Sequence, residues 1–324
     1  MSNSWKSSFL SKEFYAMIKV VHITKRFANT IAVNDISLQV KAGEIYGLVG
    51  PDGAGKTTAM RLICGALHLD SGSITIGEYD IQRQTDLARS LIGYLAQRFS
   101  LYEDLTVLEN IRFFAEVRGL SSTEWLPRSL DILQFVGLLE FKDRFAGKLS
   151  GGMKQKLGLA AALVHQPRIL LLDEPTTGVD PVTRQDFWQL IIKLATKEGV
   201  AILVSTPYMD EASRCHRVGF MRAGKILLED SPQALQNTLK NRILELKGSP
   251  LSLLKSLAAQ NPLVQDAQMF GDRIHIRIVA GQPQAVMDNL SQTIQSHGGV
   301  IQSLRVIEPQ LEDVFISLIE TNHE

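Results

Sequence analysis

The sequence predicts an α/β domain with a mixed β-sheet core, followed by a small α+β domain. Short apolar runs recur from Ile18 to Val204, and long amphipathic stretches separate them. Strands that alternate with helices in this way form largely parallel sheets with helices on their faces. A second series of strands and helices follows Ser231-Pro232, where the serine can cap a helix and the proline can take its first position. This second series predicts the small domain.

The strands expected in the α/β domain follow its apolar runs. They are residues 18–27, 31–40, 42–50, 74–76, 92–95, 168–172 and 200–204. Residues 106–163, in contrast, carry almost no strand pattern. There Thr106 and Glu109 form a capping box that opens one helix, and residues 129–135 begin another. We therefore expect a helical subdomain spanning roughly residues 100–163 within an α/β domain of residues 18–240.

The C-terminal residues predict elements in the order β-α-β-β-α-β, with one more helix at the end. The expected strands are 243–247, 264–270, 274–279 and 301–307, and the expected helices are 250–259, 284–296 and 310–319. This order is typical of a small ferredoxin-like sandwich. We therefore expect an accessory α+β domain at residues 241–324, and a polar N-terminal tail at residues 1–17.

The overall composition argues against several classes of protein. Lys and Arg number 34, and so do Asp and Glu, so no net charge favours nucleic acid and no nucleic-acid partner is expected. No run reaches the roughly 18 apolar residues of a membrane-spanning helix. The first residues lack the apolar stretch of a signal peptide, and Met17 could be an alternative start. Any membrane part of the system is then expected to be another chain.

The two cysteines predict neither a disulfide nor a metal site. Cys64 and Cys215 have no CxxC neighbour and no nearby set of His or Cys ligands. Isolated cysteines of this kind are usually reduced core thiols of a cytosolic protein. We expect that role for both.

Residues 50–58 carry the strongest motif, because they match G-x-x-x-x-G-K-[ST] between an expected strand and an expected helix. Glycines let backbone N–H groups curl around phosphate oxygens, and the helix N-terminus adds a favourable dipole. Lys56 is expected to reach the β- and γ-phosphates of a nucleotide, and Thr57 to ligate Mg²⁺. A glycine turn with an incidental lysine is the alternative. The candidate phosphate-binding residues are Gly50, Pro51, Asp52, Gly53, Ala54, Gly55, Lys56, Thr57 and Thr58.

A second motif is the apolar run at residues 168–172, which ends in two adjacent carboxylates. Carboxylates at the end of a buried strand are costly to desolvate, so a purely structural role is hard to explain. Asp173 is well placed to hold Mg²⁺ through water, as a Walker B aspartate does. Glu174 can then act as the general base for an attacking water. An ordinary strand end with charged residues is the alternative.

A third motif is Leu-Ser-Gly-Gly-Met-Lys-Gln at residues 149–155, which precedes an amphipathic helix. Two glycines at the start of a helix form a further N-terminus that can bind an anion. Taken alone, the segment is equally well explained as a loop and a helix cap. Its position ahead of Asp173, in a chain that also has a P-loop, favours the functional interpretation.

Together the three motifs resemble the nucleotide-binding domain of ABC transporters, with a P-loop, an LSGGQ-type signature and a Walker B motif in that order. The resemblance covers Ile18 to Asp230 and implies binding of ATP with Mg²⁺. Phe27 matches the aromatic residue that stacks on adenine, although a core phenylalanine is the alternative. Gln97 matches the Q-loop glutamine that meets Mg²⁺. Asp180 matches the D-loop that crosses to a partner domain.

The resemblance also implies partners. In this family each ATP lies between the P-loop of one domain and the signature of another, so a second nucleotide-binding domain is expected. The signature residues that would contact the partner's nucleotide are Ser150, Gly151, Gly152 and Met153. Integral membrane permease subunits are expected as well. They would hold this chain as a peripheral subunit at the cytoplasmic face of the inner or plasma membrane.

Within the family, the sequence is most similar to drug-efflux-type exporter ATPases that work with a separate permease chain, and to one half of bacterial tandem-ATPase efflux subunits. The similarity lies in the PDGAGKT, LYEDLTV and LSGGMKQKLGLA stretches. Residues 308–315 resemble the end of the accessory domain in such exporters, although a plain amphipathic helix is the alternative. Export of drugs or other small or amphipathic compounds is therefore expected, and import is the alternative.

One residue departs from the family pattern. Pro207 stands where the family carries a histidine that contacts the γ-phosphate. Proline offers neither a side-chain donor nor a backbone N–H. We therefore expect slow hydrolysis at this chain's own site, and a heteromeric arrangement with an unaltered partner site. His216, nine residues further on, is expected on the following helix and away from the site.

Two other functions compete with a transporter ATPase. An ATP-binding subunit that scarcely hydrolyses its nucleotide is suggested by Pro207, but Glu174 argues against it. An ABC ATPase that works on DNA or ribosomes would need long coiled-coil insertions or tandem ATPase domains with a charged linker, and the sequence shows neither.

Overall fold

A computed structural model gives the structure of the protein over residues 16–97, 101–279 and 281–321. The chain divides between Glu229 and Asp230 into two compact units. The accessory unit thus begins earlier than the expected residue 241, because helix α8 (Pro232–Asn237) packs against the last helix of that unit. The expected polar tail is also too long, since Ala16 and Met17 already belong to the first strand. The rest of that tail, residues 1–15, lies outside the described residues.

A six-stranded sheet forms the centre of the first unit, in the order β10-β9-β3-β8-β7-β6. Strand β3 runs parallel to β8 and β9, and β7 runs parallel to β8 and β6. Strands β3, β7 and β8 are buried at every residue, as is typical of a parallel sheet covered on both faces. The strands are β3 (Ile45–Val49), β6 (Ile92–Leu95), β7 (Ile169–Asp173), β8 (Ala201–Thr206), β9 (Arg217–Arg222) and β10 (Lys225–Asp230).

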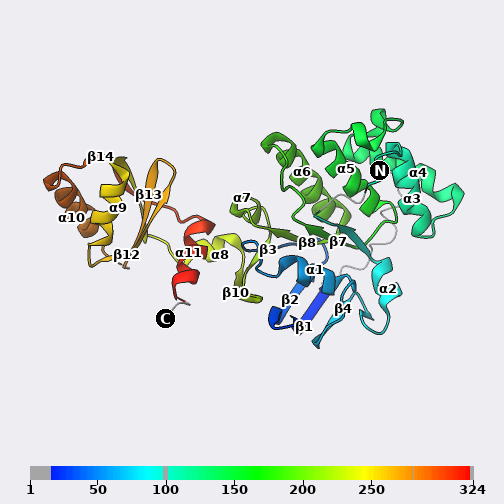
Figure 1. Ribbon diagram of the computed structural model, residues 1–324, viewed down its shortest axis with the longest axis horizontal. Coiled ribbons are helices and arrows are strands. Elements are labelled where there is room, and N and C mark those ends of the chain that lie inside the picture. Colours follow the sequence, from blue (N-terminus) through cyan, green and yellow to red (C-terminus); the bar gives the residue numbers. More distant parts are fainter. Residues whose placement is uncertain (1–15, 98–100, 280, 322–324) are drawn as a thin grey trace. The chain divides into compact units, whose positions relative to one another are not determined.

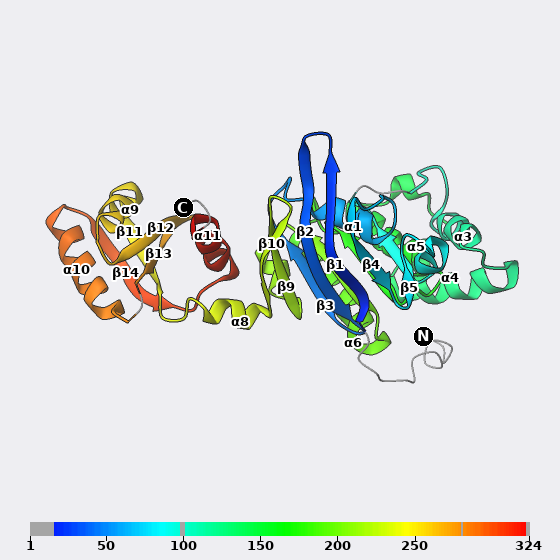
Figure 2. The ribbon, with the colours of Figure 1, turned by 90° about the horizontal axis from the view of Figure 1, so that it is seen from below.

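A second, antiparallel sheet has the order β2-β1-β4-β5. Figure 2 shows β1 and β2 as a long hairpin beside β4. Helix α1 (Lys56–Ile63) lies between the two sheets (Figure 1), and its Leu62 shares one apolar core with Val20 of β1 and Leu171 of β7. The core therefore fixes the helix that follows the P-loop. The strands are β1 (Ala16–Phe27), β2 (Thr30–Lys41), β4 (Ser71–Ile76) and β5 (Tyr79–Asp80).

Helices α3, α4 and α5 pack on one another and form the expected helical subdomain (Figure 1). No strand occurs among the described residues from 101 to 163. Helix α3 begins at the expected capping box, where the Glu109 backbone N–H donates to Thr106 Oγ1 at 3.2 Å. The prediction for the next helix is wrong, because α4 begins at a second capping box formed by Ser121 and Glu124. The helices are α3 (Val107–Val117), α4 (Ser122–Val136) and α5 (Gly151–Leu163), with 3₁₀ turns at Leu139–Phe141 and Ala146–Lys148.

Helix α6 carries the residues that follow the Walker B motif. Asp180 caps it, because its carboxylate accepts from the Thr183 backbone N–H at 3.0 Å, and Pro181 takes the first position. Gly199 ends the helix in the left-handed conformation. The ends of α6 are thus set by local sequence signals. The helices that complete this unit are α2 (Thr85–Ser90), α6 (Pro181–Glu198) and α7 (Met209–Ala212).

The second unit contains a four-stranded antiparallel sheet in the order β12-β13-β11-β14. This order, together with two crossover helices, confirms the predicted ferredoxin-like arrangement. Helices α9 and α10 cover one face of the sheet (Figure 1), and Leu244, Ile276 and Leu290 lie in the core between them. The elements are β11 (Ile243–Ser249), α9 (Leu251–Ala259), β12 (Val264–Phe270), β13 (Arg273–Ile278), α10 (Pro283–Ser296), β14 (Val300–Ile307) and α11 (Leu311–Thr321).

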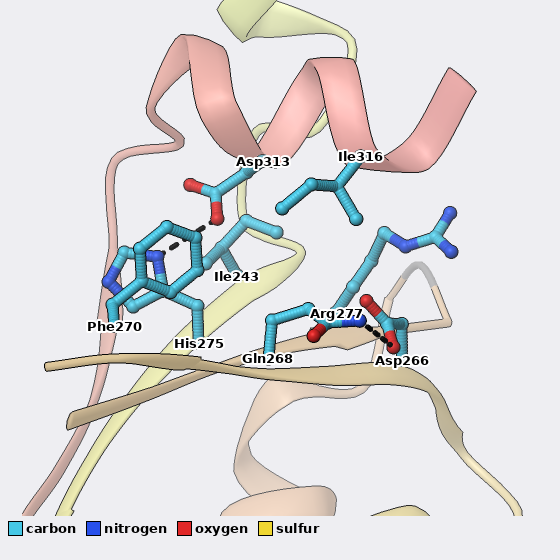
Figure 3. A pocket seen from close by; sticks show the side chains of 8 residues that line it. All are labelled: Ile243, Asp266, Gln268, Phe270, His275, Arg277, Asp313 and Ile316. Atoms are coloured by element: carbon cyan, nitrogen blue, oxygen red, sulfur yellow. Dashed lines mark hydrogen bonds and ion pairs between the residues drawn. The ribbon is translucent and has the colours of Figure 1, made fainter. Parts of the chain in front are cut away.

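The opposite face of this small sheet carries buried polar groups beneath α11 (Figure 3). Glu245 is 3% exposed and accepts from Arg273 Nη1 at 2.9 Å and from Arg305 Nη2 at 2.8 Å. His275 Nδ1 lies 2.9 Å from Asp313 Oδ1 of α11. His275 and Asp313 are both buried, so α11 is attached to the sheet by a specific polar contact as well as by its apolar side chains.

Two further expectations concern the chain as a whole. Across the described part of the chain, no helix combines the length and apolarity needed to cross a bilayer. Cys64 and Cys215 are buried, as expected for core thiols. Burial raises the pKa of both thiols, which keeps them protonated and unreactive.

Candidate active site

The P-loop packs so closely against two neighbouring segments that its outer glycines have no room for a side chain. A Cβ added at Gly50 would lie 2.1 Å from the Met221 carbonyl oxygen, and one at Gly55 would lie 2.2 Å from that of Ala32. Gly53 and Gly55 have φ values of 77° and 104°, which other residues rarely adopt. The loop ends at the N-terminus of α1, where the helix dipole favours an anion. This geometry fits a chain of phosphate groups.

Lys56 places a buried positive charge inside this loop. Its side chain is 3% exposed, and its Nζ donates to the Gly50 carbonyl at 2.8 Å and to the Pro51 carbonyl at 3.0 Å. The same Nζ lies 3.1 Å from Glu174 Oε1. A buried ammonium group requires such partners. A phosphate oxygen offers the same charge and can replace the carboxylate as a partner, so Lys56 is positioned to bind a nucleotide.

Asp173 ends β7 and is 1% exposed. Its Oδ1 accepts from Thr57 Oγ1 at 3.1 Å and from Ser205 Oγ at 2.7 Å, and its Oδ2 accepts from the Tyr94 hydroxyl at 3.3 Å. Burial and the Asp173 charge raise the pKa of Tyr94, so the phenol stays protonated and donates. The three donors hold the carboxylate facing the first turn of α1.

The paired oxygens of Thr57 and Asp173 fit Mg²⁺. Hydroxyl and carboxylate oxygens are the hard ligands that this ion prefers, and it usually takes only one or two protein ligands besides water and phosphate oxygens. The described residues include no group of three or more His, Cys, Asp or Glu that could hold a metal alone. The site therefore suits an ion that binds together with a nucleotide.

Glu174 is held in a strained backbone conformation beside these groups. Its φ of 48° is unusual for a residue other than glycine, and its backbone N–H lies 3.1 Å from the Ser205 carbonyl oxygen and 3.0 Å from Ser205 Oγ. Its Oε2 accepts from Gln97 Nε2 at 2.9 Å. The carboxylate thus lies between Lys56 and Gln97. In both contacts the carboxylate is the acceptor, so it has the acceptor chemistry that a general base for water requires.

Phe27 lies outside the apolar core. It is 46% exposed at the end of β1, and Lys25 Nζ lies 5.6 Å from its ring centroid. The alternative of a core phenylalanine is therefore excluded. The hairpin that carries Phe27 passes directly against the P-loop, since the Ala32 carbonyl crowds Gly55. An exposed ring on this hairpin is available for a planar base.

The signature and the D-loop lie beside each other, apart from the groups described so far. Ser150 caps α5 by accepting from the Met153 backbone N–H at 3.3 Å, and Gly151 is exposed. A Cβ on Gly152 would lie 2.2 Å from Thr183 Cγ2, one turn after the Asp180 cap of α6. Within the described residues, no hydrogen bond or ion pair joins this segment to the P-loop. Ser150 and Gly151, at the N-terminus of α5, are exposed.

The comparison with known proteins decides the family. The ABC transporter family matches residues 33–177. The linearmycin resistance ATP-binding protein LnrL of Bacillus subtilis is 33% identical over 309 residues, which cover 93% of this chain and 98% of LnrL. The chain belongs to the ATP-binding proteins of ABC transporters. The probable multidrug ABC transporter ATP-binding protein YbhF of Escherichia coli is 40% identical over 311 residues, or 94% of this chain. The chain spans 52% of YbhF, about half of that relative's length.

Solved structures agree with this assignment. The chain resembles CbiO1 of Clostridium perfringens, part of an ABC transporter complex, with a TM-score of 0.64 and 25% identity over 77% of this chain and 97% of that one. It also resembles the dimeric ABC transporter cassette MJ0796, with a TM-score of 0.60 and 29% identity over 66% of this chain and 98% of that one. The three ABC motifs thus lie on an ABC cassette fold.

The segment that replaces the histidine of the ABC pattern follows β8. Pro207 has no donor of its own, and the neighbouring backbone is held by Thr206, whose Oγ1 accepts from the Tyr208 backbone N–H at 3.0 Å. The expectation for His216 is wrong in one respect, because it lies in the bend before β9 and not on a helix. Its Nδ1 accepts from the Ile45 backbone N–H at 3.0 Å. Since Ile45 begins β3 and the P-loop follows its other end, His216 cannot serve the site.

Sequence reasoning missed Ser205 and Tyr94, which orient Asp173. Ser205 pairs with Asp173 in the register of β7 and β8, and Tyr94 lies on β6, the other neighbour of β7. A polar residue near the carboxyl end of an otherwise apolar buried strand was the available signal for both. This signal identifies the two residues as partners of Asp173 only when the strand order β8-β7-β6 is known.

Proposed function

We propose that this chain hydrolyses Mg²⁺-ATP to drive a membrane permease. The observation that carries the proposal is the convergence of Lys56, Asp173 and Glu174 at the P-loop. Lys56 would neutralise the β- and γ-phosphates, while Thr57 and Asp173, with Gln97 nearby, would hold Mg²⁺. The bound ion would neutralise phosphate charge and orient the phosphates. Glu174, which Lys56 releases when it binds phosphate, takes a proton from the attacking water, and Gln97 orients its carboxylate for that step.

A second nucleotide-binding domain completes the proposed machinery. Ser150, Gly151, Gly152 and Met153 lie at the start of α5, where backbone N–H groups and the helix dipole favour an anion. They would bind the nucleotide held by a partner's P-loop. The related cassette MJ0796 is dimeric, which supports this arrangement. Asp180, at the adjacent N-terminus of α6, would contact the same partner.

The names of the relatives support export as the direction of transport. YbhF is called a probable multidrug transporter subunit, and LnrL a linearmycin resistance protein. We infer that this chain serves the export of drugs or other small or amphipathic compounds. The permease would be a separate integral membrane protein that holds the chain at the cytoplasmic face of the membrane.

Pro207 sets the expected rate of the chain's own site. The backbone at this position lacks a donor, and His216 is held at the opposite end of β3. We infer slow hydrolysis and a heteromeric assembly in which a partner supplies the faster site. A subunit that binds ATP without hydrolysing it is the second candidate. The strained, hydrogen-bonded Glu174 favours the first, since a silent site has no need of a poised carboxylate.

Removal of Mg²⁺ tests the proposed activity directly. Phosphate release from ATP by the purified chain should fall to background in excess EDTA and return when Mg²⁺ is restored, because the ion that Thr57 and Asp173 would hold neutralises and orients the phosphates. Phosphate release can be followed by a coupled enzymatic assay. Release that persists in EDTA would contradict the proposal, and binding of ATP without any release would favour the second candidate.

Phe27→Ala should weaken ATP binding without removing it. Loss of one aromatic stacking contact, about 0.5–1.5 kcal/mol, corresponds to a roughly 2- to 12-fold increase in Kd. Binding of a fluorescent ATP analogue to the purified protein measures this change. Phe145→Ala is the matched control, because Phe145 is 47% exposed and also lies near a lysine, Lys148, with 5.8 Å from Nζ to the ring centroid. Equal effects of the two substitutions would exclude Phe27 from the adenine site.

A further inference from the structure

Glu211 is a buried carboxylate next to the active site that the proposed mechanism does not use. Its side chain is 1% exposed, and its Oε2 accepts from Thr206 Oγ1 at 2.6 Å. Thr176 Oγ1 donates to its Oε1. Thr206 precedes Pro207, and Thr176 follows Glu174 by two residues. Glu211 therefore joins the two segments that flank the reacting end of the site.

Arg184 supplies the positive charge that this buried carboxylate needs. Its Nε lies 3.7 Å from Glu211 Oε1, and its Nη1 lies 3.6 Å from Asp210 Oδ2. The guanidinium carbon lies 4.6 Å from the centroid of the Tyr208 ring, which is close enough for a cation–π contact. Nε is buried without a hydrogen-bond partner, so it is held by charge and by the ring rather than by a direct hydrogen bond. Arg184 thus contacts three residues that follow Pro207: Tyr208, Asp210 and Glu211.

The same segment is also attached to the P-loop. The Gly50 backbone N–H lies 3.3 Å from the Thr206 carbonyl oxygen. Thr177 follows Thr176, the partner of Glu211, and its Oγ1 lies 3.5 Å from Glu174 Oε2. Contacts therefore run from the first glycine of the P-loop, through Thr206 and Glu211, to the loop that carries the catalytic carboxylate. A shift of the Glu211 side chain would move both ends of this path.

We propose that Arg184 and Glu211 are positioning residues that lock residues 206–208 against the loop after Glu174. The proposal rests on the proposed ATPase function for its effect on rate, but not for the contacts themselves. Their contacts are with Thr176, Thr206, Tyr208 and Asp210, not with Lys56 or Asp173. They act through Thr206 and Thr176, and they give the segment around Pro207 a fixed geometry in the absence of an imidazole at that position.

Four substitutions test this positioning role in the full-length chain. Arg184→Gln removes the charge and the planar group, Arg184→Lys keeps the charge alone, and Glu211→Gln keeps the shape of the carboxylate without its charge. Lys193→Gln is the matched control on the same helix. It removes a cation–π contact, with Nζ 4.9 Å from the Phe135 ring centroid, that lies outside this network.

We expect Arg184→Gln and Glu211→Gln to lower kcat by about 10- to 100-fold, the effect typical of a displaced catalytic group, while KM for ATP changes by less than about threefold. Arg184→Lys should recover only part of kcat. Lys193→Gln should match the wild type. Each rate is divided by the amount of nucleotide bound per chain, so that unfolded protein does not lower the apparent kcat. A raised KM with unchanged kcat would assign these residues to nucleotide binding and overturn the proposal.

Hydrogen exchange gives a second readout that does not depend on hydrolysis. In Arg184→Gln the amides of residues 206–212 and 174–178 should exchange faster than in the wild type and in Lys193→Gln, because their shared anchor is loosened. Unchanged exchange in both segments would overturn the positioning role even if the enzyme were slower. A wild type without any turnover would refute the proposed ATPase function alone, and the exchange result would still decide this inference.

Discussion

Glu174→Gln is expected to lower ATP turnover by about 10²- to 10⁴-fold, the usual contribution of a general base. Glutamine has the shape of glutamate and can still accept from Lys56, but it cannot take a proton from water. The backbone hydrogen bonds that hold residue 174 to Ser205 do not involve the side chain and should persist. The loss should therefore appear in kcat and not in the affinity for ATP.

Turnover and binding of a fluorescent ATP analogue, measured on the same preparation, separate these two effects. Asp186→Asn is a suitable control, since Asp186 is 61% exposed on α6 and pairs with Lys156 at 3.5 Å. It should behave like the wild type. Turnover that survives Glu174→Gln would mean that another group activates the water, and the role assigned to Glu174 would be wrong.

Lys56→Met is expected to abolish ATP binding and to destabilise the protein. The substitution leaves Glu174 with 7% side-chain exposure and without its cation, and breaking a buried ion pair from one side typically costs about 3–5 kcal/mol of unfolding free energy. Chemical denaturation, monitored by fluorescence, measures that cost. Nucleotide binding should be lost in the same preparation because the phosphates lose their only buried cation among the P-loop residues.

The double variant Lys56→Met, Glu174→Gln distinguishes these two consequences. With the unpaired charge removed as well, most of the lost stability should return, whereas ATP binding should not. A single variant as stable as the wild type would show that Glu174 carries no buried charge in the folded protein. Retained ATP binding would exclude Lys56 from the phosphate site.

Much of the fold follows from the sequence because local and long-range signals agree. The apolar runs at β3, β7 and β8 are long enough to be buried on both faces. Asp173 ends β7, and Lys56 begins the helix that follows β3 and the P-loop. The order of elements in the C-terminal unit likewise follows from the periodicity of its apolar residues and from its turn residues. The helix expected to begin at residues 129–135 begins earlier, because a capping box at Ser121 and Glu124 starts α4, and the helix accommodates Pro127 in its interior.

The site was predicted less completely, since its contacts join distant strands. The P-loop and Walker B motifs identify Lys56 and Asp173 by spacing alone, but Ser205 and Tyr94 reach Asp173 only through the order of strands in the sheet. Arg184 was equally hidden, because nothing local relates a helix residue to Tyr208. Sequence spacing reveals contacts within one loop, whereas contacts between strand ends require the topology.

Pro207 is expected to make this chain's own site slow. ATP turnover by the wild type beside Pro207→His and Pro207→Ala, with the oligomeric state recorded in ATP, tests this most directly. Alanine restores the backbone N–H without adding an imidazole, so the comparison separates the effect of the imidazole from that of the backbone N–H. We expect slow turnover in the wild type and in Pro207→Ala, and a rise of at least about tenfold in Pro207→His. Fast turnover by a wild-type homodimer, unchanged in Pro207→His, would show that Pro207 does not slow the site.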